Sequence, residues 1–204
     1  MSGEDLAARF GAIDIYLFDQ ILRGRVSPGA RVLDAGCGGG RNLVYLLREG
    51  YDVSAADRDA GAVAAVRRLA SELAPALPDD HFRVEPLEGL TFADASFDVV
   101  IASAVLHFAR DDAHFSAMLD GLWRVLAPGG VLFTRLASTI GMEGRARPIG
   151  GGRYHLPDGS DRYLVDADAL AGQAQRLGGT LLDPLKTTIV QDQRAMTTWV
   201  LGKP

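Results

Sequence analysis

The chain has 204 residues, of which 48% are apolar and 23% charged, and its net charge is −5. This length suits one domain with a real core, and the acidic balance argues against tight binding to a nucleic-acid backbone. A single cysteine, Cys37, excludes an intrachain disulfide. Residues 1–10 lack the apolar segment of a signal peptide. No apolar run approaches the roughly 20 residues of a membrane span, so we expect a cytoplasmic protein with no membrane partner.

Helical and strand patterns alternate along most of the chain. Helices are predicted at residues 13–22, 42–49, 60–73, 112–126 and 166–177. Strands are predicted at residues 31–35, 51–56, 82–86, 97–103, 131–136, 185–191 and 196–201. Such alternation with short turns predicts an α/β fold with a parallel sheet and helices on both faces. The last two strands flank a short polar turn and predict a hairpin, so we expect an antiparallel strand at the end of the sheet.

A turn is expected at residues 128–130, which read Pro-Gly-Gly, between the fourth helix and the strand that follows it. Residues 137–159 are rich in Gly, Arg and Pro and show no clear period. We expect this segment to run over the surface as a long excursion.

The central motif is the glycine-rich segment 36–40, which follows the first predicted strand. Glycine allows a positive φ and lets a ligand lie against the backbone, and a helix start offers free N–H groups and a positive dipole end. This combination suits a dinucleotide phosphate or the carboxylate of an amino acid. The dinucleotide fingerprint needs a glycine where Arg41 stands. Its absence argues against a nicotinamide-dependent oxidoreductase.

Two acids accompany this segment. Asp34 precedes the first glycine, where it can neutralise a ligand's ammonium group directly or through water, or bond the loop amides from the sheet end. Asp57 ends the second strand, roughly the 20 residues further on at which an acid that holds ribose hydroxyls is expected. Together these features favour a nucleoside joined to a zwitterionic amino acid, which describes S-adenosylmethionine.

These residues carry a resemblance to a known family. The stretch 32–57 resembles the first two motifs of class I S-adenosylmethionine-dependent methyltransferases. Residues 96–100 resemble that family's fourth-strand motif, and residues 126–130 resemble its turn before strand five. The Gly-Arg-Asn at 40–42 is similar to that of the small tellurite-resistance and ubiquinone-biosynthesis-like methyltransferases.

The resemblance implies a Rossmann-like, doubly wound and mostly parallel sheet of seven strands with an antiparallel C-terminal strand. It further implies one methyltransferase domain, 1–204. We expect residues 1–26 to form an N-terminal helical lid and residues 137–165 to form an excursion that covers the acceptor site.

The resemblance also implies a set of cofactor-binding residues. They are Asp34, Gly36, Cys37, Gly38, Arg41, Asp57, Arg58, Leu87, Glu88, Ala102 and Ser103. Asp57 would accept both ribose hydroxyls, and Ala102 or Ser103 would approach the methionyl group or the reacting methyl. Arg41 would either pair with the methionyl carboxylate or face solvent, and Cys37 would pack as a small apolar residue.

The adenine contact departs from the family pattern. Relatives often carry an Asp that meets the adenine amine, and Pro86 stands at that place. The Leu87 N–H can still meet adenine N1, while Glu85 or Glu88 can accept from the amine. The sequence leaves the choice between these two acids open.

His107 follows the fourth predicted strand, where acceptors usually lie in this fold. Neutral imidazole suits a general base, but a histidine at a helix start can equally contact water or the core. His107 and His114 have no evident third ligand, so no metal site is expected. Candidate lid residues, which can recognise an anionic acceptor or remain solvated, are Tyr16, Arg145, Arg147, Tyr154 and His155.

The expected function is in-line transfer of the sulfonium methyl to a small-molecule acceptor, with S-adenosylhomocysteine as product. One alternative is a protein that binds S-adenosylmethionine without catalysis, and another is an RNA methyltransferase. The Asn-Pro-Pro-aromatic signature is absent after the fourth strand, which weakens methylation of exocyclic base amines. The acceptor, its reacting atom, the use of a general base and the oligomeric state stay open.

Overall fold

The computed structural model describes residues 3–204, so the first two residues of the expected lid 1–26 lie outside the described part. The helices are α1 (Gly3–Phe10), α2 (Ile15–Leu22), α3 (Leu43–Arg48), α4 (Ala60–Leu73), α5 (Asp112–Val125) and α6 (Ala167–Leu177). Short 3₁₀ turns are η1 (Asp79–His81), η2 (Leu87–Gly89) and η3 (Leu106–Phe108). The strands of the main sheet are β1 (Arg31–Ala35), β2 (Asp52–Asp57), β3 (Phe82–Val84), β4 (Phe97–Ser103), β5 (Leu126–Ser138), β9 (Thr180–Leu181), β10 (Lys186–Val190) and β11 (Arg194–Gly202).

The main sheet follows the order β10-β11-β5-β4-β1-β2-β3, and the two-residue β9 pairs with β11 beside this path. Neighbouring strands from β5 to β3 are parallel, whereas β11 is antiparallel to both β5 and β10. This arrangement confirms the predicted doubly wound sheet with an antiparallel C-terminal strand. The chain order reverses between β1 and β4, and ligands of open α/β sheets bind at the carboxyl ends of strands at such a switch point.

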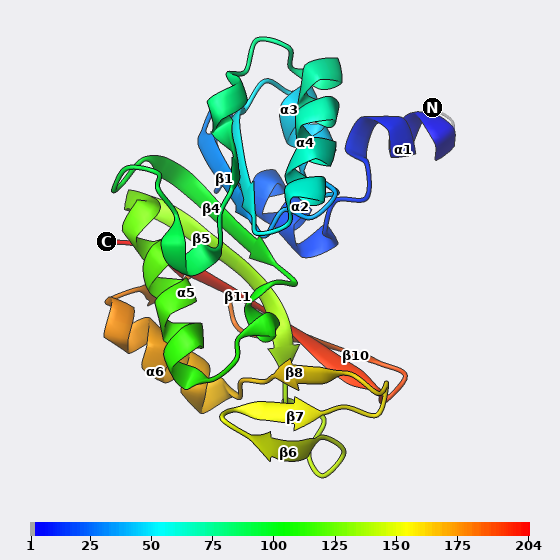
Figure 1. Ribbon diagram of the computed structural model, residues 1–204, viewed down its shortest axis with the longest axis vertical. Helices are drawn as coiled ribbons and strands as arrows, with labels where there is room; N and C mark the ends of the chain where they lie inside the picture. The colour runs from blue at the N-terminus through cyan, green and yellow to red at the C-terminus, as the bar shows by residue number, and fades with distance from the viewer. Residues whose placement is uncertain (1–2) are drawn as a thin grey trace.

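Helices cover both faces of the sheet, with α5 and α6 on one side and α2, α3 and α4 on the other (Figure 1). Successive residues of a strand point to opposite faces. Val32 of β1 accordingly packs with the α3 and α4 side, and Leu33 packs with α5. Both side chains are completely buried, as expected of a parallel strand that is covered by helices on both faces.

The excursion predicted as irregular contains a second sheet. Its three antiparallel strands are β6 (Arg147–Gly150), β7 (Arg153–His155) and β8 (Asp161–Tyr163). The prediction missed them because they are short and almost entirely exposed or half-buried, so no apolar alternation marks them. Figure 1 places them below the arrowhead of β5. The Tyr163 hydroxyl donates to Asp112 Oδ1 over 2.8 Å, which fastens β8 to the start of α5.

The turn expected at residues 128–130 lies inside β5. The ladder with β4 breaks after Leu126 pairs with Phe97 and resumes where Val131 pairs with Val99. Gly129 adopts a φ of +77° in this interruption, and its N–H donates to the Lys203 carbonyl. The Pro-Gly-Gly segment is therefore a bulge held by the C-terminal residues and not a free turn before the strand.

Among residues 3–204, no helix has the length and hydropathy that a membrane crossing requires.

A contact between α5 and η2 supplies a test of the packing. A methyl group added at Gly121 of α5 would lie 2.1 Å from the Leu87 carbonyl oxygen. Because overpacking typically costs 1–3 kcal/mol, we expect Gly121→Ala to lower the free energy of unfolding by about 2 kcal/mol in urea titrations. Gly172→Ala in α6 is the matched control, since its added methyl meets no atom within 4 Å. That variant should raise the free energy of unfolding by about 0.5–1 kcal/mol. Equal effects of the two variants would contradict this packing.

Candidate active site

The glycine loop, residues 36–40, leaves β1 at the switch point of the sheet. Gly36 and Gly38 have φ values of +77° and +49°, a region that favours glycine. A methyl group at Gly36 would lie 2.4 Å from Val105 Cγ2, so the loop passes close to the segment that follows β4. The Gly36 and Cys37 N–H groups both donate to the Ala56 carbonyl, over 2.7 and 3.2 Å. The end of β2 thereby fixes the loop.

A cavity of about 380 Å³, called here the glycine cavity, opens beside this loop. Predicted cofactor-binding residues that line it are Gly36, Gly38, Asp57, Arg58, Leu87 and Glu88. Lining residues that the sequence prediction missed are Asp59, Ala104, Val105, Phe108, His114 and Met118. Five of the missed residues follow β4 or lie on α5, and no local motif marks them.

Asp57 lies at the carboxyl end of β2 and is fixed on both of its oxygens. Oδ2 accepts from the Gly38 N–H and Oδ1 accepts from the Asp59 N–H, each over 2.9 Å. A carboxylate offers about four acceptor positions, so each oxygen retains one for a ligand. Two hydroxyl donors held side by side, as on a ribose, match this arrangement.

Asp34 lies behind the loop and does not line the glycine cavity. Its residue is 1% exposed, and its Oδ2 is buried without a hydrogen-bond partner. Burial raises the pKa of Asp34 to about 7, and the nearby Asp57 adds to this effect while Arg41 opposes it. A buried carboxyl group without a partner is costly unless a cation or donor compensates it. Asp34 is therefore a buried acid next to the glycine cavity, and it is not part of the lining that a ligand would touch.

The raised pKa of Asp34 predicts how stability depends on pH. Between the ordinary pKa of 3.8 and about 7, the folded protein holds a proton that the unfolded chain has released. The contribution of Asp34 to stability is therefore complete below its ordinary pKa and is lost as the pH rises through the folded pKa. We expect Asp34→Asn to be more stable relative to the parent at about pH 8 than at about pH 5 in urea titrations. A stability difference that is constant, or larger at the lower pH, would contradict the raised pKa.

Pro86 and Glu88, from the segment after β3, also line the glycine cavity. Glu88 Oε1 lies 3.0 Å from His114 Nε2, and His114 Nδ1 accepts from the Arg110 N–H over 3.1 Å. This pattern assigns the proton of a neutral His114 to Nε2. Burial alone would raise the pKa of Glu88, but hydrogen bonds from its backbone and His114 outweigh burial and lower it. Glu85, the other acid left open by the sequence, accepts from Thr91 and does not line the cavity.

The remaining predicted residues lie around the loop. Cys37 and Ala102 are buried in the core, and burial raises the pKa of the Cys37 thiol, which keeps it protonated. Arg41 Nη2 donates to Ser103 Oγ over 3.1 Å. Arg41 thereby faces a second cavity on the other side of the loop.

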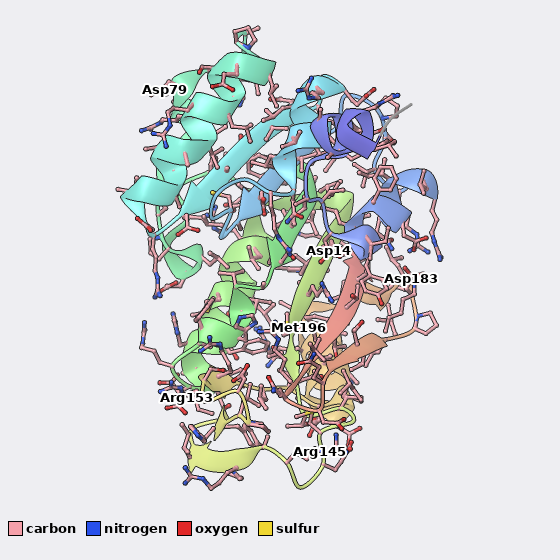
Figure 2. All side chains as sticks on the ribbon, turned by 90° about the vertical axis from the view of Figure 1, so that its right-hand side faces the viewer. Asp14, Asp79, Arg145, Arg153, Asp183 and Met196 are labelled. Atoms are coloured by element: carbon pink, nitrogen blue, oxygen red, sulfur yellow. The ribbon has the colours of Figure 1, made fainter. Side chains whose placement is uncertain are left out.

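This second cavity, also of about 380 Å³, is called here the arginine cavity. Its charged lining residues are Arg41, Arg135, Arg162, Arg194 and Asp158. It shares Ala104 and Phe108 with the glycine cavity, so the two cavities meet just beyond β4. Residues of the excursion 137–165 line one side of it, with Leu156 and Ser160 among them. In Figure 2, Met196 of this lining lies near the middle of the molecule, above the small sheet that carries Arg153.

His107 lines the arginine cavity and not the glycine cavity. It is 8% exposed, and its Nδ1 is buried without a hydrogen-bond partner. Burial, with smaller contributions from Arg162 and Arg194, lowers the pKa of His107 to about 4. The imidazole is therefore neutral near pH 7 and can accept a hydrogen bond.

The candidate lid residues do not line either cavity. Tyr16 bonds Thr188 through its hydroxyl over 3.0 Å, and Arg145 pairs with Asp192. His155 pairs with Asp161 on the neighbouring strand. Within residues 3–204, no three His, Cys, Asp or Glu side chains are grouped to hold a metal ion.

Comparisons with known proteins show which family this chain resembles. Residues 33–134 match the family profile described as "Methyltransferase domain". The ubiquinone biosynthesis O-methyltransferase of Methylocella silvestris is 35% identical over 187 residues, which cover 84% of this chain and 70% of that protein. The chain spans about half the length of the first curated relatives it matches.

Two solved structures share the fold. One is the 1,6-didemethyltoxoflavin-N1-methyltransferase of Burkholderia thailandensis, crystallised with 1,6-didemethyltoxoflavin and S-adenosylhomocysteine. It has a TM-score of 0.70 and 20% identity, and the match covers 99% of this chain and 83% of that one. The other is the cyclase SpnF, with a TM-score of 0.70, 19% identity and coverage of 93% and 80%. Since a cyclase shares this fold, the fold alone does not fix the reaction.

Proposed function

The chain belongs to the class I S-adenosylmethionine-dependent methyltransferases, and from this premise we propose that it methylates a small molecule bound in the arginine cavity. The observation that carries the proposal is the meeting of two cavities at Ala104 and Phe108. A ligand in the glycine cavity and a ligand in the arginine cavity would touch the same two side chains. That neighbourhood is what transfer of a group between two bound molecules requires.

In the proposed complex, the glycine cavity holds the cofactor. The backbone at Gly36 and Gly38 contacts the methionyl and ribose parts, and Asp57 accepts the ribose hydroxyls on its free lone pairs. The buried Asp34 lies behind this loop, and its carboxyl group favours a positively charged group of the cofactor without touching it. Glu88 accepts from the adenine amine and is itself held in position by His114. It takes the role of the Asp that relatives often carry at the position of Pro86.

When bound, S-adenosylmethionine supplies a methyl group on a positively charged sulfur, which a nucleophile can displace in line. The protein's contribution is then mainly to position the acceptor and exclude water. Ala104 is suited to the shared wall, because its side chain is small. Its φ of +63° is rare for a residue other than glycine and turns the chain sharply after β4. The neutral His107 lines the same cavity and can hydrogen-bond the acceptor there, which would orient the nucleophile.

The test is acceptor-dependent release of S-adenosylhomocysteine, followed by mass spectrometry, over a panel of small phenols, amines, thiols and acids. We expect at least one acceptor to be methylated. Met196→Trp should abolish that transfer and leave the affinity for S-adenosylhomocysteine unchanged, because Met196 lines only the arginine cavity. An unchanged rate of methyl transfer by Met196→Trp would show that the acceptor does not bind in the arginine cavity. Tight cofactor binding without transfer to any acceptor would favour the alternative of a non-catalytic binding protein.

A further inference from the structure

The arginine cavity differs in charge from the rest of the molecule. Four arginines and one acid line it, although the whole chain has a net charge of −5. The arginines come from segments far apart in the sequence, and the excursion and β11 bring Arg162 and Arg194 over the end of β5. A concave site of one charge sign attracts ligands of the opposite sign.

Two of the arginines are already compensated. Arg135 Nη1 lies 2.9 Å from Asp14 Oδ2, and Arg41 Nη2 lies 3.6 Å from the same oxygen. The Asp14 side chain is completely buried and caps α2 by accepting from the Tyr16 N–H. Asp14 therefore holds both guanidinium groups in place, and its single negative charge offsets one of their two positive charges.

The other two arginines are less compensated. Arg162 donates to the Asp161 carbonyl over 2.8 Å, and its guanidinium lies 4.9 Å from the centre of the Phe108 ring. Arg194 approaches Asp158 only to 3.9 Å, and Asp158 Oδ1 is occupied by the Ser160 N–H and hydroxyl. Arg162 and Arg194 thus leave positive charge that no side chain of the cavity fully neutralises.

From this geometry, and resting on the proposed function, we infer that the methyl acceptor is a small organic acid with an apolar body. Its carboxylate binds Arg162 and Arg194, and its body lies on the apolar part of the lining, which includes Phe108, Leu156 and Met196. Guanidinium groups bind carboxylates through short charge-assisted hydrogen bonds. Asp158 in the same wall disfavours a dianion such as a phosphate monoester, because a second negative charge would face a carboxylate.

The carboxylate in this site is an anchor, and a second group of the acceptor receives the methyl. Hydrogen bonds from arginine stabilise the anionic form and lower its basicity, which makes the bound carboxylate a poorer nucleophile. The nucleophile then lies toward Ala104 and His107, at the end of the cavity that meets the glycine cavity.

The test measures binding to the protein saturated with S-adenosylhomocysteine. The probes are 4-hydroxybenzoate, hexanoate and phenylacetate, their neutral amides, and phenyl phosphate. We expect at least one acid to bind about tenfold more tightly than its amide. Arg162→Met should remove that difference by weakening the acid alone, and Arg194→Met should reduce it. Arg147→Met is the matched control, because Arg147 is exposed on β6 and lies outside the cavity.

Three results of the binding test would overturn the inference. They are equal or absent binding of acids and amides, an effect of Arg147→Met as large as that of Arg162→Met, and phenyl phosphate as the tightest probe. The last would assign a phosphate-bearing acceptor. If the protein methylated only neutral acceptors, the proposed function would hold, and only the inference that the acceptor is an organic acid would be wrong. Failure to bind S-adenosylhomocysteine would instead remove the proposed function, and the acid-to-amide ratio of the unloaded protein would still report on the arginines.

Discussion

Asp57→Ala will weaken the binding of S-adenosylhomocysteine by about 100-fold or more in calorimetric titrations. The substitution removes the proposed acceptor of both ribose hydroxyls, and hydrogen bonds to a charged group contribute about 1.5–3 kcal/mol each. The substitution also removes the 2.9 Å hydrogen bond from the Gly38 N–H to Asp57, so the glycine loop loses a contact that fixes its position.

Asp52→Ala is the matched control for this experiment. Asp52 begins the same strand, is exposed, and lies 3.5 Å from His81 Nδ1 at the opposite end of the sheet. Its removal should change the affinity by less than about twofold, since an exposed ion pair contributes little. A folded Asp57→Ala protein with nearly parental affinity would show that the ribose is not held at the end of β2.

Gly36→Ala will abolish measurable binding of S-adenosylhomocysteine and lower the free energy of unfolding by about 3 kcal/mol or more. Two costs combine at this position. The backbone has a φ of +77°, and the added methyl would lie 2.4 Å from Val105 Cγ2, so the loop or the segment after β4 must move. Both segments line the glycine cavity, and either movement changes its shape.

Gly29→Ala separates these two costs. Gly29 has a φ of +73° in the turn before β1, and a methyl group there meets no atom within 4 Å. We expect this variant to lose only about 1 kcal/mol of unfolding free energy and to bind S-adenosylhomocysteine normally. Urea titration and calorimetry of both variants are the measurements. Equal losses of stability would mean that the close contact with Val105 contributes nothing.

The elements that the sequence predicted well are those with a local signal. The boundaries of β1, β4 and α4 agree with the expected ranges. The glycine-rich segment marks the end of β1, β4 is a mostly apolar run, and α4 is a periodic helix with clear end signals. The glycine loop and Asp57 follow directly from strand ends, so a motif in the sequence could find them. Glu88 could be named only as one of two acids, since which of the two lines the cavity depends on how η2 packs on α5.

The arginine cavity could not be predicted in this way. Arg41, Arg135, Arg162 and Arg194 share no spacing or period, and only the sheet order and the folded excursion bring them together. The cluster that the sequence does show begins at Arg145, which pairs with Asp192 in the turn between β10 and β11. The basic stretch that is visible in the sequence therefore lies outside the lining of both cavities.

The end of β4 shows a second, smaller limit of prediction from the sequence. The predicted strand end at Ser103 agrees with the structure, but Ala102 is completely buried and the cavity lining begins at Ala104. The shift arises from the positive φ of Ala104, which carries the chain over the sheet edge. An alanine gives no sign of such a turn in the sequence.

A crystal structure with bound S-adenosylhomocysteine would test most directly that one cavity holds the cofactor and the other the acceptor. We expect the ribose on Asp57, the adenine beside Leu87 and Glu88, and the sulfur near Ala104, with the arginine cavity left free of this ligand. S-adenosylhomocysteine bound among Arg135, Arg162 and Arg194 would contradict the assignment of both cavities.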